Sequence, residues 1–100
     1  MAFYNKLVRD KVPEILDSKG ISYEQRVASE SEYKSELIKK LSEEVSEFSS
    51  DLSVEELADV LEVIDALKKL SDYMEVEKVQ KKKRDEKGGF ENRFILKGEK

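Results

Sequence analysis

Apolar residues recur every three or four positions in the middle of the chain: Leu37, Ile38, Leu41, Val45 and Phe48. This period places them in one stripe along a helix. Ahead of the stripe, Ser29 and Glu32 have the spacing of a capping box, in which a serine hydroxyl binds an unpaired amide of the first helical turn. Nothing from there to Ser50 breaks a helix, so the pattern predicts one from the Ser29 cap to about Ser50.

A second apolar pattern follows a predicted turn at residues 49–53. It occupies two adjacent helix faces: Leu57, Val60, Leu61, Val63, Ile64, Ala66, Leu67 and Leu70. Ser53 and Glu56 repeat the capping-box spacing, so this helix should begin at Val54. Because a helix that is apolar over most of its circumference is usually surrounded by other elements, we expect it to be central.

Shorter helices are predicted on either side of this pair. Towards the N-terminus, Asp10 can cap a helix that accommodates Pro13 in its first turn. Gly20 can close that helix at about Lys19. Residues 21–28 then have an extended pattern.

Asp72 and Glu75 have the spacing of a third cap, ahead of a fourth helix from about Tyr73 to Lys87 that Gly88-Gly89 would stop. Residues 90–97 are predicted to be extended. The patterns together predict an all-α fold, an antiparallel helical bundle of about four helices with short extended termini. Residues 1–100 would form a single domain.

The composition changes this picture by suggesting a partner chain. Only 38% of the 100 residues are hydrophobic, and so small a chain buries a modest share of its surface. We therefore expect a homo-oligomer in which helices of several copies complete a shared core. The net charge of −4 argues against nucleic-acid binding, because that interaction relies on basic surfaces.

The chain has neither cysteine nor histidine. Their absence excludes the usual zinc sites, cysteine nucleophiles and Ser-His-Asp triads. Any metal must then bind to oxygen, which favours Mg²⁺, with Mn²⁺ as a possible substitute. There is no secretory leader pattern and no apolar run of membrane-spanning length, so a cytoplasmic protein without membrane association is expected.

Two acidic pairs flank the predicted turn between the central helices. Glu44 and Glu47 are three residues apart on one helix, and Glu56 and Asp59 are three apart on the next. In an antiparallel hairpin Glu47 falls level with Glu56, and Glu44 with Asp59, with the two levels roughly 4.5 Å apart. Four carboxylates so close repel one another unless cations lie between them, which predicts a divalent-metal site.

Simpler interpretations of the same residues remain open at this point. With 23 acidic residues in the chain, pairs at this spacing arise by chance. Glu56 could be only the second half of a capping box with Ser53. Glu43, Glu44 and Glu47 could be solvent-facing charges on a surface helix.

The acidic motifs resemble those of a known enzyme family. The segments Glu43-Glu44-Val45-Ser46-Glu47 and Glu56-Leu57-Ala58-Asp59 are similar to the paired acidic signature of the MazG-like, all-α nucleotide pyrophosphohydrolases. The opening segment at residues 4–13 and Gly88-Gly89-Phe90 resemble a small subgroup labelled phosphoribosyl-ATP pyrophosphohydrolase-like. The resemblance therefore spans nearly the whole chain.

The resemblance implies an activity and a set of site residues. Family members split the bond between the α- and β-phosphates of a nucleotide, release pyrophosphate, and assemble as dimers or tetramers. By position, the implied Mg²⁺ ligands are Glu44, Glu47, Glu56 and Asp59. Glu43 is the candidate catalytic residue, which would orient or deprotonate the attacking water.

Fixed cations are also expected where phosphates bind. The candidates for substrate binding are Lys6, Arg9, Lys11 and Arg84, with Lys81, Lys82 and Lys83 beside the last. Alternatively, the basic residues at 81–84 form a solvated helix face, and their positive charges interact favourably with the negative end of the helix dipole. Three aromatic residues could stack on a base or simply pack in a core or an interface: Tyr4, Tyr23 and Phe90.

These observations predict a magnesium-dependent hydrolase that converts a nucleoside triphosphate, or a related nucleotide such as phosphoribosyl-ATP, to monophosphate and pyrophosphate. Clearance of non-standard or surplus nucleotides fits the small single-domain form. One rival is a non-catalytic acidic helical interaction module. Another is a helical protein that binds divalent cations without turnover.

Overall fold

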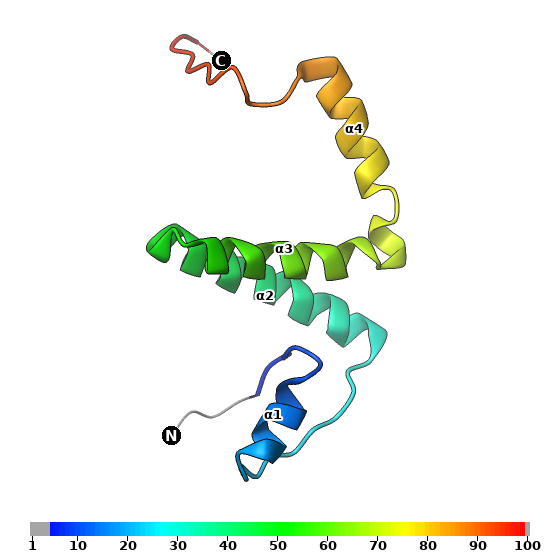
Figure 1. Cartoon of the computed structure of the whole chain (residues 1–100). Coiled ribbons are helices and arrows are strands. Elements are labelled where there is room, and N and C mark those ends of the chain that lie inside the picture. Colours follow the sequence, from blue (N-terminus) through cyan, green and yellow to red (C-terminus); the bar gives the residue numbers. More distant parts are fainter. Residues whose placement is uncertain (1–4, 100) are drawn as a thin grey trace.

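Four α-helices and one 3-10 turn make up the secondary structure of residues 5–99, the part of the chain that the computed structural model describes. In chain order these are α1 (Val12–Ser18), α2 (Glu30–Asp51), α3 (Val54–Lys68), the 3-10 turn η1 (Ser71–Tyr73) and α4 (Val76–Lys87) (Figure 1). The predicted all-α fold class is confirmed, and this range contains no strand. None of its helices is both long and apolar enough to cross a membrane.

Helices α2 and α3 form a hairpin whose ends are fixed by two serine caps. The Ser29 hydroxyl accepts a hydrogen bond from the Glu32 amide at 3.3 Å, and the Ser53 hydroxyl accepts one from the Glu56 amide at 3.1 Å. Both predicted caps are confirmed. Between the helices Leu52 adopts the left-handed conformation at φ 56°, which reverses the chain within two residues.

The core lies almost wholly inside this hairpin. Leu37 of α2 and Val60 and Val63 of α3 are the buried hydrophobic residues of the described chain, and α2 with α3 is the one pair of elements with extensive contact. Helix α3 was expected to be central, but among the described elements only α2 makes extensive contact with it. Leu57 and Leu61 consequently remain 45% and 54% exposed.

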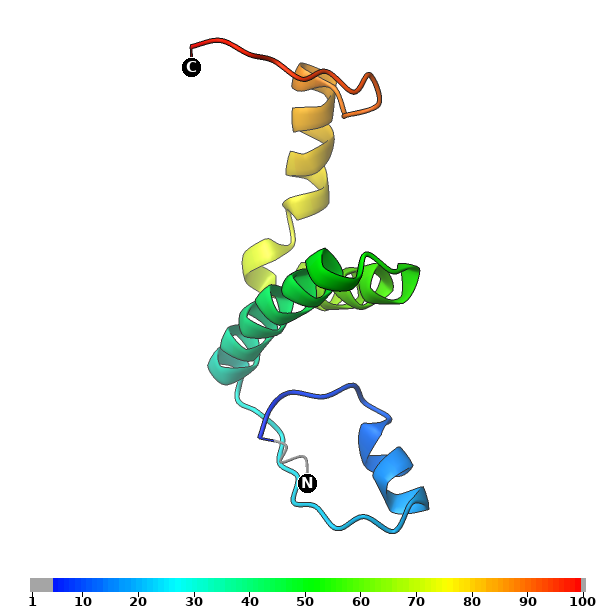
Figure 2. The same cartoon turned by 90° about the vertical axis from the view of Figure 1, so that its left-hand side faces the viewer.

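Helices α1 and α4 flank the hairpin on opposite sides, and α4 projects away from it (Figures 1 and 2). The Cα radius of gyration is 17.9 Å, whereas a compact chain of this length has a radius of about 13 Å. The extended shape has a sequence cause, because α4 carries only two apolar residues, Val76 and Val79, among its twelve. Such a helix has little to gain from packing onto the hairpin.

Two predicted helix starts were wrong. The residue that precedes α1 is Lys11, not Asp10, and its side chain makes no capping bond. Helix α4 begins at Val76, three residues later than predicted, because the Asp72 carboxylate accepts a hydrogen bond from the Lys34 ammonium at 2.6 Å instead of capping. The predicted end of α4 at Lys87 is confirmed, with Gly88 at φ 81°.

The Ser53 cap should contribute measurably to stability, because it begins the helix that carries Glu56 and Asp59. We expect Ser53→Ala to lower the free energy of unfolding by about 1 kcal/mol, and Ser53→Asp, which restores a capping oxygen, to recover most of it. Ser46→Ala, at an exposed position in the middle of α2, is the control. Urea unfolding followed by circular dichroism measures all three, and equal stabilities for Ser53→Ala and Ser46→Ala would contradict the role of the cap.

Candidate metal centre

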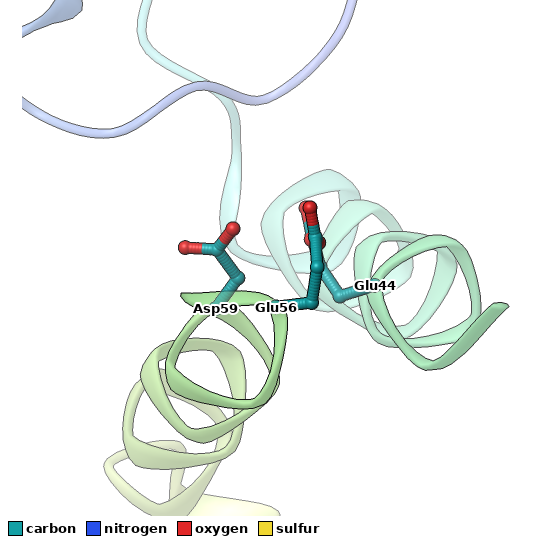
Figure 3. Close-up of side chains that lie close together, drawn as sticks. All are labelled: Glu44, Glu56 and Asp59. Atoms are coloured by element: carbon teal, nitrogen blue, oxygen red, sulfur yellow. The ribbon is translucent and has the colours of Figure 1, made fainter. Parts of the chain in front are cut away.

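A cluster of carboxylates bridges the two helices of the hairpin. Single oxygens from Glu44 of α2 and from Glu56 and Asp59 of α3 all lie within 4.8 Å of one another. The three side chains point to the same side of the hairpin, toward the non-helical segment that leads into α1 (Figure 3). The structure thus brings together three of the four carboxylates that the acidic spacing predicted.

Glu44 is the most deeply placed of the three. Only 7% of the residue is exposed, so it is not a solvent-facing charge on a surface helix. Its Oε2 atom and the Oε2 atom of Glu56 are buried, and neither has a hydrogen-bond partner. A buried carboxylate oxygen without a partner is costly, which makes this pair of oxygens receptive to a cation.

Glu56 combines two roles that the sequence presented as alternatives. Its backbone amide completes the Ser53 cap, while its side chain joins the carboxylate cluster. The cap fixes the first turn of α3 and therefore the direction in which the Glu56 side chain leaves the helix. Capping and clustering are compatible because one uses the backbone and the other the side chain.

Glu47 lies outside the three-residue group and is exposed. It is nevertheless close enough for its negative charge to act on two members of the cluster. Burial raises the pKa of the Glu44 carboxyl, and the neighbouring Glu47 charge raises it further. The pKa of Glu56 is raised by the same two causes in the same order, with Asp59 adding to them.

Lys40 opposes this concentration of negative charge, and sequence reasoning missed it. Its ammonium lies 3.7 Å from Glu44 Oε1, and both side chains are largely buried. The pair is separated by four residues on α2, which is the spacing of an ion pair on one helix face. This spacing could have identified the ion pair from the sequence, but the basic residues of the segment were not considered together with the acidic ones.

Two of the predicted basic residues bring the N-terminal segment to the hairpin: Arg9 contacts the cluster itself, and Lys6 contacts Glu43 next to it. The Arg9 guanidinium donates a hydrogen bond from Nη2 to Asp59 Oδ1 at 2.7 Å, and its Nη1 lies 3.8 Å from Glu62 Oε1. Lys6 Nζ lies 3.3 Å from Glu43 Oε1. Arg9 and Lys6 therefore border the carboxylates, and Glu62 is a further neighbour that sequence reasoning did not single out.

The other candidate residues lie elsewhere. Lys11 precedes α1 and is exposed. Arg84 lies on α4, where it forms an ion pair with Glu91 at 2.7 Å, and α4 extends away from the side that bears the carboxylates. Of the aromatic candidates, Tyr23 donates a hydrogen bond to Asp17 at 2.8 Å and Phe90 is almost fully exposed, while Tyr4 lies outside the described residues.

The donor set fits a hard divalent cation. All of its atoms are carboxylate oxygens, two of them buried without a partner, and hard cations such as Mg²⁺ prefer such ligands. Glu44, Glu56 and Asp59 would hold the ion.

Comparison with known proteins adds no relative. The sequence matches no protein-family model, no curated protein and no solved structure.

The raised pKa of Glu44 makes a prediction about stability. A carboxyl whose folded pKa is raised costs stability when it is ionised, and this cost disappears as the pH falls through that pKa. Without divalent cations, we expect Glu44→Gln to melt a few degrees above the native protein at pH 7, an advantage that shrinks as the pH is lowered toward the raised pKa of Glu44. Differential scanning calorimetry at a series of decreasing pH values measures the difference in melting temperature.

The control for this experiment is Glu36→Gln, the same change on the same helix outside the cluster. Mg²⁺ should raise the melting temperature of the native protein and of Glu36→Gln more than that of Glu44→Gln. A Glu44→Gln protein that melts below the native protein at pH 7 in the absence of metal would show that the Lys40 pair outweighs the cost of burying Glu44.

Proposed function

We propose that this protein is a magnesium-dependent nucleotide pyrophosphohydrolase, which converts a nucleoside triphosphate or a related nucleotide to monophosphate and pyrophosphate. The observation that carries the proposal is the buried Glu44, whose Oε2 lacks a partner beside Glu56 and Asp59. An acidic protein that used its charges only to bind a partner would have no reason to bury this carboxylate. The resemblance to the MazG-like enzymes supports the same activity.

The basic residues around the cluster support a phosphate-bearing substrate. Arg9 and Lys6 sit at its border on a segment that belongs to no helix. A guanidinium is suited to bidentate contact with phosphate oxygens, and an ammonium adds a point charge. Nucleotide clearance in the cytoplasm, or hydrolysis of phosphoribosyl-ATP, would both use such an arrangement.

The reaction we propose is attack of water on a phosphorus of the triphosphate chain. A P–O–P bond breaks and pyrophosphate leaves. Magnesium, which Glu44, Glu56 and Asp59 would hold, would act as a Lewis acid and offset the negative charge that develops on the phosphate oxygens. Glu43, half-buried on α2 beside Lys6, would orient the attacking water and accept its proton. Lys6 and Arg9 would then hold the phosphate chain.

Rotation of the Glu47 side chain would complete the proposed set of four metal ligands. It is exposed, and its side chain has three rotatable bonds, so its carboxylate can turn toward the cluster without a change in the backbone. Its charge already acts on Glu44 and Glu56. Binding of a cation would favour the inward orientation because it turns repulsion among the carboxylates into shared coordination.

Pyrophosphate release provides the direct test. We expect the native protein to release pyrophosphate from at least one member of a panel of standard and modified nucleoside triphosphates and phosphoribosyl-ATP, and only with Mg²⁺ or Mn²⁺ present. Asp59→Asn should reduce kcat/KM by about 100-fold or more, because it removes a ligand charge from the cluster. The matched control is Asp65→Asn, the same change at an exposed position of α3.

Control activity equal to native activity, together with loss in Asp59→Asn, would establish that the cluster is the active site. No release from any nucleotide, with a melting temperature unaffected by Mg²⁺, would favour the interaction module. Stabilisation by Mg²⁺ without release would favour a protein that binds cations without turnover.

We also propose that the protein is a homodimer or homotetramer. On the side of the hairpin opposite the carboxylates, helical spacing aligns four half-exposed apolar residues: Ile38, Val45, Leu57 and Leu61. Helix α4 leaves this face uncovered. A second copy carries the same two-helix face, and packing the two hairpins together would make a four-helix core.

The test of this assembly is Leu61→Glu, which places a charge in the middle of the apolar face. We expect the native protein to elute as an oligomer in size-exclusion chromatography with light scattering, and Leu61→Glu to elute as a monomer. Ala58→Glu introduces the same charge on the solvent side of α3 and should leave the oligomer intact. A native protein that is monomeric at high concentration would contradict the proposal.

A further inference from the structure

The positively charged Arg9 contacts the carboxylate cluster that would bind a metal cation. Its guanidinium contacts Asp59 Oδ1 at 2.7 Å and also lies near Glu62. Asp59 is one of the three residues whose oxygens converge within 4.8 Å. The same positive charge therefore neutralises part of the cluster that would hold a divalent ion, and it would repel that ion.

Arg9 differs from Lys40, the other cation at the cluster, in its freedom to leave. Lys40 projects from the rigid helix α2, and four-fifths of its side chain is buried. Arg9 lies before α1 and belongs to no helix, and 57% of its side chain is exposed. Rotation of the Arg9 side chain alone can release Asp59, whereas Lys40 cannot leave Glu44 without exposing the buried carboxylate.

We propose that Arg9 exchanges partners during ligand binding, from the Asp59 carboxylate to a phosphate of the nucleotide, and so couples the binding of metal and substrate. This inference rests on the proposed function. A phosphate gives the guanidinium two oxygens in place of the single oxygen it holds on Asp59. Once Arg9 has moved, the full charge of Asp59 acts on the metal ion, and each ligand favours the other.

The exchange predicts effects of opposite sign from one substitution. Arg9→Ala should bind Mg²⁺ about three- to tenfold more tightly than the native protein, because a nearby positive charge is gone. It should bind an α,β-methylene nucleoside triphosphate, which is not cleaved at that bond, about tenfold or more weakly, because a phosphate ligand is gone. An arginine that only secured the N-terminal segment would not strengthen metal binding on its removal.

Isothermal titration calorimetry measures both affinities, each with and without the other ligand. In the native protein the analogue should tighten Mg²⁺ binding, and in Arg9→Ala this enhancement should be smaller. Arg9→Lys keeps the positive charge but loses the two-pronged guanidinium that can bind two phosphate oxygens. Its Mg²⁺ affinity should therefore stay near native while its affinity for the analogue falls. Arg26→Ala is the matched control, since Arg26 forms an ion pair with Glu32, about 18 Å along α2 from Glu44.

Tighter Mg²⁺ binding with weaker analogue binding in Arg9→Ala, and neither in Arg26→Ala, supports the exchange. Unchanged or weaker Mg²⁺ binding in Arg9→Ala overturns it. The outcome is separable from that of the proposed function, because these affinities are measured without turnover. A native protein that binds both ligands cooperatively but releases no pyrophosphate would refute the hydrolase and leave the exchange supported.

Discussion

The repulsion among carboxylates inside the α2–α3 hairpin is the constraint on which the rest of the structure depends. Glu44, Glu56 and Asp59 are held together by the same helix pair that buries the small core of Leu37, Val60 and Val63. Three buried apolar residues provide little to set against a buried charge. The cations around the cluster, Lys40 and Arg9 above all, are therefore part of what allows the hairpin to form.

The hairpin was predictable from the sequence because its determinants are local. Each serine cap acts within three residues, and the register of two helices joined by so short a turn follows from chain geometry. From these features alone, Glu44, Glu56 and Asp59 could be expected to meet. Glu47 has the same helical spacing but is exposed, and the orientation of an exposed side chain is not set by backbone periodicity.

Apart from the Lys40–Glu44 pair within α2, the contacts that sequence reasoning missed join residues far apart in the chain. Arg9 reaches Asp59 across 50 positions, and Lys34 reaches Asp72 across 38, which removes Asp72 from the cap that its local spacing predicted. Ion pairs of this kind have no periodic signal. The isolation of α4 could have been inferred from the sequence, since Val76 and Val79 are its only apolar residues. The predicted helix rested instead on its cap spacing and its glycine stop, which do not show whether the helix has an apolar face to pack.

The hairpin has an acidic surface on one side and an apolar surface on the other, and the two are mechanically coupled because the hairpin is thin. One side carries the carboxylates and the other the exposed Leu57 and Leu61, with only a single layer of buried residues between. Val60 packs within the same turn of α3 as Asp59 and Leu61, so a rotation of α3 that buried more of Leu61 would move Asp59 as well. In the proposed oligomer, a partner seated on Leu57 and Leu61 would thus restrict the rotation of α3 and hold Asp59 in register with Glu44. Pre-organisation of this kind reduces the cost of gathering ligands around an ion, so oligomer formation and metal affinity should be thermodynamically linked through one helix.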